Sequence, residues 1–159
     1  MRNKKTAHRV VAFLEEQKSK WERGRYPDAF LDELLFIVQG YSLAMLGEPL
    51  FEEDFFLDEN GILFLQKTTG DFEPLTEVER NFIERVLKEH FMKDDWFSSI
   101  AILKIMASLR QELEFEVKKR GFLFFKRKRK FNKTDIKNAF VRFILKNSLI
   151  PSERVSAGY

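Results

Sequence analysis

Apolar side chains recur at helical spacing along most of this chain, and the pattern predicts five helices. The first spans residues 6–21, with Thr6 as its predicted N-cap. Its apolar positions lie near one helical face: Val10, Phe13, Leu14 and Trp21. Charged residues are predicted to form an exposed side of the same helix: Arg9, Glu15, Glu16 and Lys20.

The second predicted helix, from Asp28 to Leu46, is apolar on nearly every side. Such a helix is expected at the centre of a domain, covered by the other elements. Pro27 stands directly before it, where the first turn of a helix tolerates a missing N–H. Gly47 predicts a left-handed stop at the C-terminal end, and Pro49 prevents the helix from resuming.

Residues 55–65 contain two short apolar runs on either side of Asn60-Gly61. An Asn-Gly pair is the strongest short signal for a hairpin turn, because both residues tolerate positive φ angles. We therefore predict a small β-hairpin here. Beyond it, Thr76 to Glu79 match a capping box and predict a third helix that ends near Phe91. Its apolar positions are Val78, Phe82, Val86 and Leu87.

A fourth helix is predicted from an N-cap at Asp94 or Asp95 to Gly121. Its apolar positions keep a helical period: Ile100, Leu103, Met106, Leu109 or Arg110, Leu113 and Val117. Two ion pairs at i, i+4 spacing agree with a helix: Glu114–Lys118 and Glu116–Arg120. Residues 113–117 also alternate apolar and acidic, so a strand that turns at Gly121 is the alternative. We favour the helix.

The last predicted helix begins at Thr134 or Asp135 and ends before Pro151. It buries four apolar residues: Ile136, Phe140, Phe143 and Ile144. No repeat and no linker divides the chain. The predicted fold is therefore mainly α (α+β): residues 1–151 form a single domain with a helical core of about five helices and one small β-hairpin near residues 55–65. Residues 152–159 are expected to be a frayed C-terminal tail.

Composition narrows the class of protein. The 159 residues include 18 Phe and no Cys. The phenylalanines supply a large apolar area for one core or an interface. Without Cys, a disulfide framework, a thiolate metal site and a cysteine nucleophile are excluded. Because no run approaches the ~18 apolar residues that span a bilayer, we expect a cytoplasmic protein that is neither exported nor embedded in a membrane.

Charge is separated along the chain, although the net charge is only +3. Residues 48–95 hold 14 acidic and 5 basic side chains, whereas residues 118–133 hold 9 basic and no acidic ones. The two segments are expected either to pair within the fold or to leave a basic patch that meets a partner.

Residue types suited to catalysis or metal binding are scarce. Near neutral pH, only His8 and His90 are available as an acid, a base or an imidazole ligand. Glu89 is adjacent to His90, so the two side chains point to different faces of one helix. No phosphate loop, nucleophile elbow or dinucleotide fingerprint is present. The sequence predicts no enzyme, no metal site and no cofactor.

The best candidates for contact with a partner are six basic residues: Lys126, Arg127, Lys128, Arg129, Lys130 and Lys133. Phe125 and Phe131 flank the first five. Cations can contact phosphates and aromatic rings can stack on unpaired bases, so binding to nucleic acid or to a membrane surface is one interpretation. The favoured interpretation is a structural one or a protein partner: a solvated loop, or a loop docked on the acidic segment 48–95.

One block of sequence resembles a known family. Residues 31–51 combine a Leu-rich helix with a set of marker residues: Phe36, Gln39, Tyr41, Leu43, Gly47, Pro49, Leu50 and Phe51. Residues 52–55 continue the likeness. With these residues the chain resembles the Panacea domain family, which includes phage-associated GepA-like proteins and SocA-like antitoxins. It departs from the family pattern at Ile62, where a proline is usual.

The resemblance implies a non-enzymatic function. Panacea-type proteins resemble antitoxins that neutralise a toxin by direct contact, or adaptors that deliver a toxin to a protease. We expect core packing rather than partner contact for the large residues of the block: Phe36, Tyr41, Leu50 and Phe51.

Our leading hypothesis is therefore a protein-binding domain of antitoxin or adaptor type. A small nucleic-acid-binding protein that uses residues 126–133 is the alternative. The sequence leaves the oligomeric state open, and a homodimer through exposed Phe is one alternative.

Overall fold

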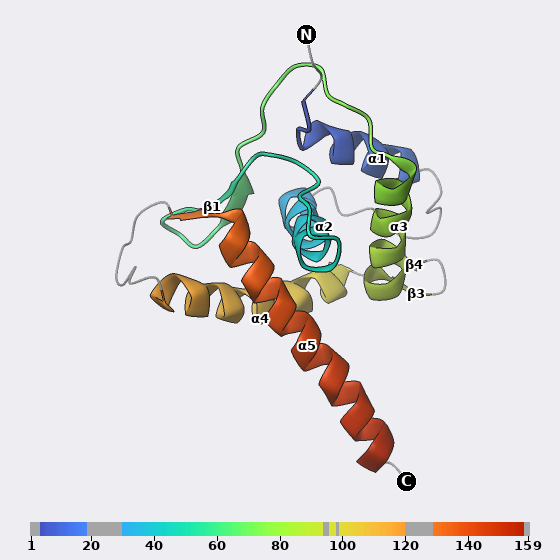
Figure 1. The fold of residues 1–159 in the computed structure, drawn as a ribbon, viewed down its shortest axis with the longest axis vertical. Helices are drawn as coiled ribbons and strands as arrows, with labels where there is room; N and C mark the ends of the chain where they lie inside the picture. Colours follow the sequence, from blue (N-terminus) through green and yellow to red (C-terminus); the bar gives the residue numbers. More distant parts are fainter. Residues whose placement is uncertain (1–3, 19–29, 94–95, 98, 120–128, 158–159) are drawn as a thin grey trace.

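The computed structural model describes residues 4–18, 30–93, 96–97, 99–119 and 129–157 (Figure 1). Within these residues the fold is mainly α with a small antiparallel sheet, which confirms the predicted fold class. The elements follow in chain order as α1 (His8–Lys18), α2 (Leu31–Met45), β1 (Phe55–Leu57), β2 (Leu63–Leu65), α3 (Glu77–Phe91), β3 (Met92–Lys93), β4 (Trp96–Phe97), α4 (Ser99–Lys119), β5 (Arg129–Phe131) and α5 (Lys133–Ala157).

Several predicted features lie outside the described residues. These are Lys20, Trp21, Pro27, Asp28, Asp94, Asp95, Arg120 and Gly121, together with the first part of the basic segment.

Helix α2 is the central element of the fold. Figure 1 shows it in the middle of the molecule, with the other helices around it. Ten successive residues, Leu34–Leu43, are buried, so the helix has no solvent-facing side over almost three turns. Gly47 adopts a φ of 78° and donates its N–H to the Ser42 carbonyl at 3.0 Å. The predicted central helix and its left-handed stop are both confirmed.

Helix α1 turns its predicted apolar face towards the core, since Val10, Phe13 and Leu14 are buried. The prediction that Arg9 is exposed is wrong, because its side chain is fully buried. The guanidinium donates to the Leu50 carbonyl at 3.0 Å, to the Pro74 carbonyl at 3.1 Å and to Glu79 at 2.6 Å. These acceptors compensate the loss of water around a buried charge.

The predicted N-cap at Thr6 does not form. Its hydroxyl is buried and makes no hydrogen bond to any described residue. The N–H of Ala7, at the start of the helix, instead donates to both carboxylate oxygens of Glu53, at 2.9 and 3.0 Å. The negative charge of a carboxylate near a helix N-terminus also interacts favourably with the helix dipole. Glu53, which is distant in sequence, therefore takes the place of a local cap.

The capping box of α3 is confirmed. Thr76 Oγ1 accepts from the Glu79 N–H at 3.2 Å, and Glu79 Oε1 accepts from the Thr76 N–H at 2.9 Å. The same Glu79 oxygen binds Arg9, so the cap also joins α3 to α1. Of the predicted apolar face, Phe82, Val86 and Leu87 are buried, whereas Val78 is exposed.

The predicted hairpin is present as the antiparallel pair β1 and β2, with Phe55 opposite Leu65. Gly61 in its turn has a φ of 79°, as a turn residue without a Cβ can. A third strand, β5, pairs antiparallel with the other edge of β1 and places Phe131 opposite Phe55. This strand was not predicted from the sequence, and it brings part of the basic segment onto the sheet.

Helix α4 continues to Lys119, which confirms the helix over the alternative strand at residues 113–117. The predicted buried positions Met106, Leu109, Leu113 and Val117 are correct, but Ile100 and Leu103 are exposed. Ile102 is buried instead. The face that α4 turns towards α2 and α5 therefore differs at its N-terminal end from the expected one.

The beginning and the end of α5 also differ from prediction. Asn132 Oδ1 accepts from the Asp135 N–H at 2.8 Å, so Asn132 is the cap rather than Thr134 or Asp135. The helix continues through Pro151 to Ala157 and projects from the body in Figure 1. Proline removes one backbone hydrogen bond and strains one turn, and here it does not end the helix.

A network of charged side chains joins α4 to α5. The Arg142 guanidinium donates to Glu112 and to Glu116, each at 2.9 Å, and Lys146 also donates to Glu112. Glu116 therefore pairs with α5, and its predicted partner Arg120 lies outside the described residues. Burial alone would raise the pKa of Glu112, but the hydrogen bonds from Lys146 and Arg142 lower it below its ordinary value of 4.5.

A substitution at Gly40 tests the close approach of α2 and α5. A Cβ at this position would lie 2.0 Å from Phe140 Cε1. We expect Gly40→Ala to lower the free energy of unfolding by about 1–3 kcal/mol through overpacking, although Ala normally favours a helix over Gly by about 1 kcal/mol. Urea unfolding measures the change. In a Phe140→Leu background the same substitution should be less harmful, and an unchanged or higher stability in the wild-type background would contradict the contact.

Glu112 gives the fold a pH dependence. Because its pKa is lowered in the folded state, its stabilising contribution is present above about pH 4.5 and is lost as the pH falls through the folded-state pKa. We expect Glu112→Gln to lower stability by about 1–2 kcal/mol at pH 7, with the difference from wild type vanishing in acid. The exposed Glu114 is the matched control, and Glu114→Gln should change little. A difference for Glu112→Gln that persists at pH 3 would refute this origin.

Candidate binding surface

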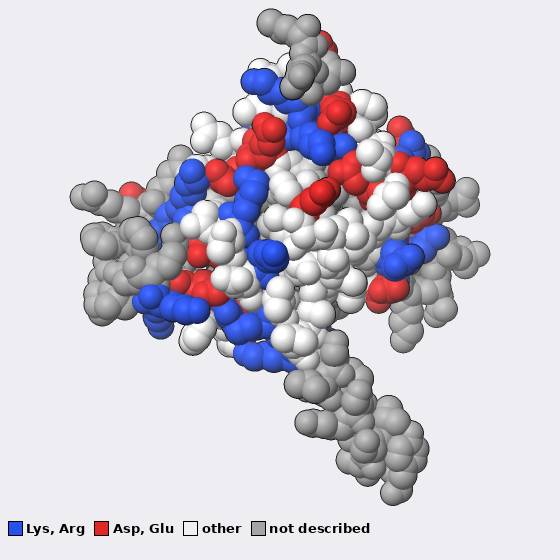
Figure 2. Space-filling model, in the orientation of Figure 1, with Lys and Arg blue, Asp and Glu red and all other residues white. Residues whose placement is uncertain are grey.

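The structure describes three of the six basic candidates. Lys126, Arg127 and Lys128 lie outside the described residues, Arg129 and Lys130 lie in β5, and Lys133 begins α5. Figure 2 shows that basic and acidic side chains are interspersed on the visible face, with uncharged atoms in the middle between α5 and α3.

Lys130 and Lys133 both pair with the acidic segment. Their ammonium groups lie 3.2 and 3.1 Å from the two carboxylate oxygens of Asp54, and Lys133 also donates to the Glu52 carbonyl at 2.7 Å. Exposed ion pairs of this kind contribute little stability. They do, however, engage both ammonium groups with a carboxylate of the same chain. For these two lysines the structure therefore shows docking within the fold.

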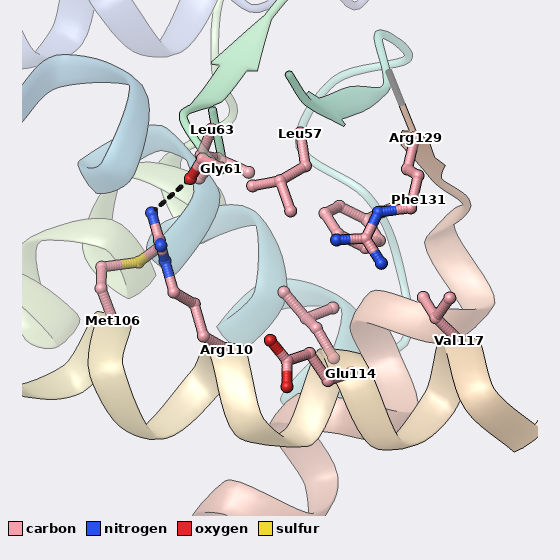
Figure 3. A pocket seen from close by; sticks show the side chains of 10 residues that line it. Leu57, Gly61, Leu63, Met106, Arg110, Glu114, Val117, Arg129 and Phe131 are labelled. Atoms are coloured by element: carbon pink, nitrogen blue, oxygen red, sulfur yellow. Dashed lines mark hydrogen bonds between the residues drawn. The ribbon is translucent and has the colours of Figure 1, made fainter. Parts of the chain in front are cut away.

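Arg129 differs from its two neighbours, because no described residue forms an ion pair with its guanidinium. Figure 3 shows the side chain extending from β5 towards α4. It borders a cavity of about 140 Å³ between the sheet and α4. Six apolar residues supply most of the wall: Leu57, Leu63, Met106, Leu113, Val117 and Phe131.

Two more charged residues border this cavity, both on α4 (Figure 3). Arg110 donates to the Gly61 carbonyl at 2.8 Å and is thereby held against the hairpin turn. Glu114 lies one helical turn further along and makes no ion pair with Lys118, its predicted partner. Burial raises the pKa of nearby Glu33, an effect that the positive charge of Arg110 partly opposes.

The exposed face of α4 leads to this cavity. Ile100 and Leu103 are 65% and 53% exposed, and Ala107 is exposed as well. The spacing i, i+3, i+7 places the three on one side of the helix, and Arg110 and Glu114 continue the same side. We call these five residues the α4 face. The apolar residues of α4 cover a wider arc than one buried stripe needs, and this excess is the sequence signal from which an exposed apolar face could have been predicted.

Of the two histidines, His90 has the more defined surroundings. Its ring stacks on Tyr41, with the centroids 4.8 Å apart. Burial lowers the pKa of His90 and raises the pKa of Tyr41 to about 12. Within the described ranges, no group of three His, Cys, Asp or Glu side chains is arranged to hold a metal ion.

Within residues 31–55, hydrogen bonds hold the segment that follows α2 against this helix. The side-chain amide of Gln39 donates to the Phe51 carbonyl at 2.9 Å and accepts from the Leu50 N–H at 2.7 Å. Ser42 donates to the Glu48 carbonyl at 2.7 Å. The four large residues expected in the core are all buried: Phe36, Tyr41, Leu50 and Phe51. The marker residues of the block thus hold the chain against α2.

Among the described residues, none of the helices combines the length and apolar character that crossing a membrane requires. No family model, no curated protein and no solved structure matches the chain.

A substitution at Gln39 tests whether its two hydrogen bonds stabilise the fold. Gln39→Leu keeps a similar volume but leaves the buried N–H of Leu50 and carbonyl of Phe51 without partners. At about 1–3 kcal/mol for each of the two unsatisfied groups, we expect a loss of about 2–6 kcal/mol in unfolding free energy. Urea denaturation measures it, with Gln111→Leu on the exposed side of α4 as the control. Similar small effects for both variants would show that the Gln39 bonds are not needed.

Proposed function

We propose that this chain is a non-enzymatic, cytoplasmic protein-binding domain of antitoxin or adaptor type, which neutralises a toxin by direct contact. The observation that carries the proposal is the exposed apolar part of the α4 face. Burial of Ile100 and Leu103 was predicted from the helical spacing of apolar residues, yet both side chains are exposed to solvent. A protein partner that covers them gains the free energy of removing apolar surface from water.

The Panacea-like block supports the same proposal from another side. Gln39, Ser42, Leu50 and Phe51 are engaged in holding α2 and the following segment together. Because these residues act inside the fold, a resemblance in this block concerns the scaffold. Partner recognition then falls to surfaces outside the block, and the α4 face is one of them.

The partner segment should match the α4 face in chemistry. An aliphatic or aromatic side chain of the partner would cover Leu103. Polar groups of the partner would contact Arg110 and Glu114 at the charged end of the α4 face. Such a face is apolar at its centre and charged at its edge, as protein interfaces commonly are. We rank a protein partner above nucleic acid because Lys130 and Lys133 already pair with Asp54.

Co-expression tests the proposal. The chain is expressed together with the product of the adjacent gene, and growth rescue and co-purification are scored. We expect the neighbour to be toxic alone, to be harmless with this chain, and to co-purify with it. A neighbour that is harmless alone and does not co-purify contradicts the antitoxin proposal.

Two matched variants locate the contact. Leu103→Glu places a charge on the α4 face, whereas Val78→Glu makes the same change at an exposed position of α3. We expect Leu103→Glu to abolish rescue and to weaken co-purification by at least tenfold, since a charge would be buried without a partner. Val78→Glu should behave as wild type. Equal loss in both variants would move the contact away from α4.

A titration against DNA and RNA at two salt concentrations examines the nucleic-acid alternative. Fluorescence anisotropy that rises at low salt, with affinity falling steeply as salt increases, would favour that alternative. No binding at low salt removes it.

A further inference from the structure

We propose that the cavity between the sheet and α4 is a binding site for a carboxylate carried on an apolar group about the size of one side chain. The apolar wall would take the alkyl or aryl group, and Arg129 would bind the carboxylate. This site is separate from the apolar part of the α4 face, although both use α4.

The size of the cavity selects a small group. Its volume of about 140 Å³ is close to that of an engineered apolar cavity of about 150 Å³ that holds one benzene molecule. A single ring or a branched aliphatic side chain therefore fits, whereas a drug-sized ligand, which occupies at least about 300 Å³, does not. The six apolar wall residues offer such a group contacts on several sides.

The charges at the cavity select an anion beside that group. No described residue forms an ion pair with Arg129, and Figure 3 shows its side chain reaching from β5 towards the opposite wall. A guanidinium matches a carboxylate in shape and donates two parallel hydrogen bonds to it. Arg110 is less available, because it is bonded to the Gly61 carbonyl and lies near Glu33.

Glu114 has the opposite effect. It stands on α4 beside the same cavity (Figure 3), and its negative charge repels an incoming carboxylate. Removing the charge of Arg129 and removing the charge of Glu114 should therefore change the affinity for the carboxylate in opposite directions. Loss of the Arg129 charge weakens binding, and loss of the Glu114 charge strengthens it.

Two sources could supply this chemistry. One is the C-terminal residue of a polypeptide, with its free carboxylate and an apolar side chain. This case rests on the proposed function, because the polypeptide would be the bound protein partner. The other is a free small acid, which is independent of that proposal.

The experiment titrates the full chain with two pairs of probes by isothermal titration calorimetry at low salt. The first pair is an acetylated Gly-Gly-Leu tripeptide as free acid and as C-terminal amide, and the second is phenylacetate and phenylacetamide. We expect the acids to bind at least tenfold more tightly than the amides. Tighter binding of the tripeptide acid assigns a polypeptide end, and tighter binding of phenylacetate assigns a free acid.

Three variants complete the test. Arg129→Gln should weaken binding of the acid about tenfold or more, as expected for loss of a hydrogen bond between charged groups. Glu114→Gln should strengthen it. Lys130→Gln removes the neighbouring charge, which pairs with Asp54, and should change the affinity little. Thermal unfolding of each variant verifies that the fold is kept.

Absence of acid binding, equal binding of acid and amide, or equal losses in Arg129→Gln and Lys130→Gln would each overturn the inference. These outcomes are distinguishable from failure of the proposed function, because growth rescue with Leu103→Glu and Val78→Glu does not depend on this cavity.

Discussion

The complete burial of α2 is the constraint on which the rest of the structure depends. Its ten buried residues, Leu34–Leu43, need cover on every side, and this forces the other helices and the sheet to surround it. A helix without a solvent-exposed face also needs hydrogen-bond partners within the protein for its polar side chains. Gln39 and Ser42 find them in the backbone immediately after the helix, so one local arrangement both satisfies α2 and directs the chain towards the sheet.

Close covering of α2 has consequences for the elements around it. Phe140 of α5 packs against the backbone of α2 because Gly40 has no side chain, and the ring centroids of Phe140 and Phe36 lie 5.4 Å apart. The α5 helix is then joined to α4 by Arg142, which binds Glu112 and Glu116. With one side of α4 engaged in this way, its opposite side remains open to solvent.

Buried charges have a similar organising effect at the other end of the molecule. Arg9 binds two backbone carbonyls and Glu79, so α1, the segment after α2 and the start of α3 meet at one guanidinium. A charge in such a place is tolerated only when every nearby acceptor is in position, and it therefore restricts how these segments can pack. The surface left over by these arrangements is the α4 face and the cavity beside it, where both proposed binding activities fall.

The sequence by itself determined the features whose signals are local. The apolar run of α2, the stop at Gly47, the turn at Gly61 and the capping box at Thr76 each depend on a few neighbouring residues, and all were predicted correctly. Only the tertiary structure decided that Arg9 is buried, that Leu103 is exposed, and that Arg129 lies in a strand beside a cavity. Burial and charge pairing depend on partners that are distant in sequence, and helical or strand periodicity contains no information about which partners will arrive.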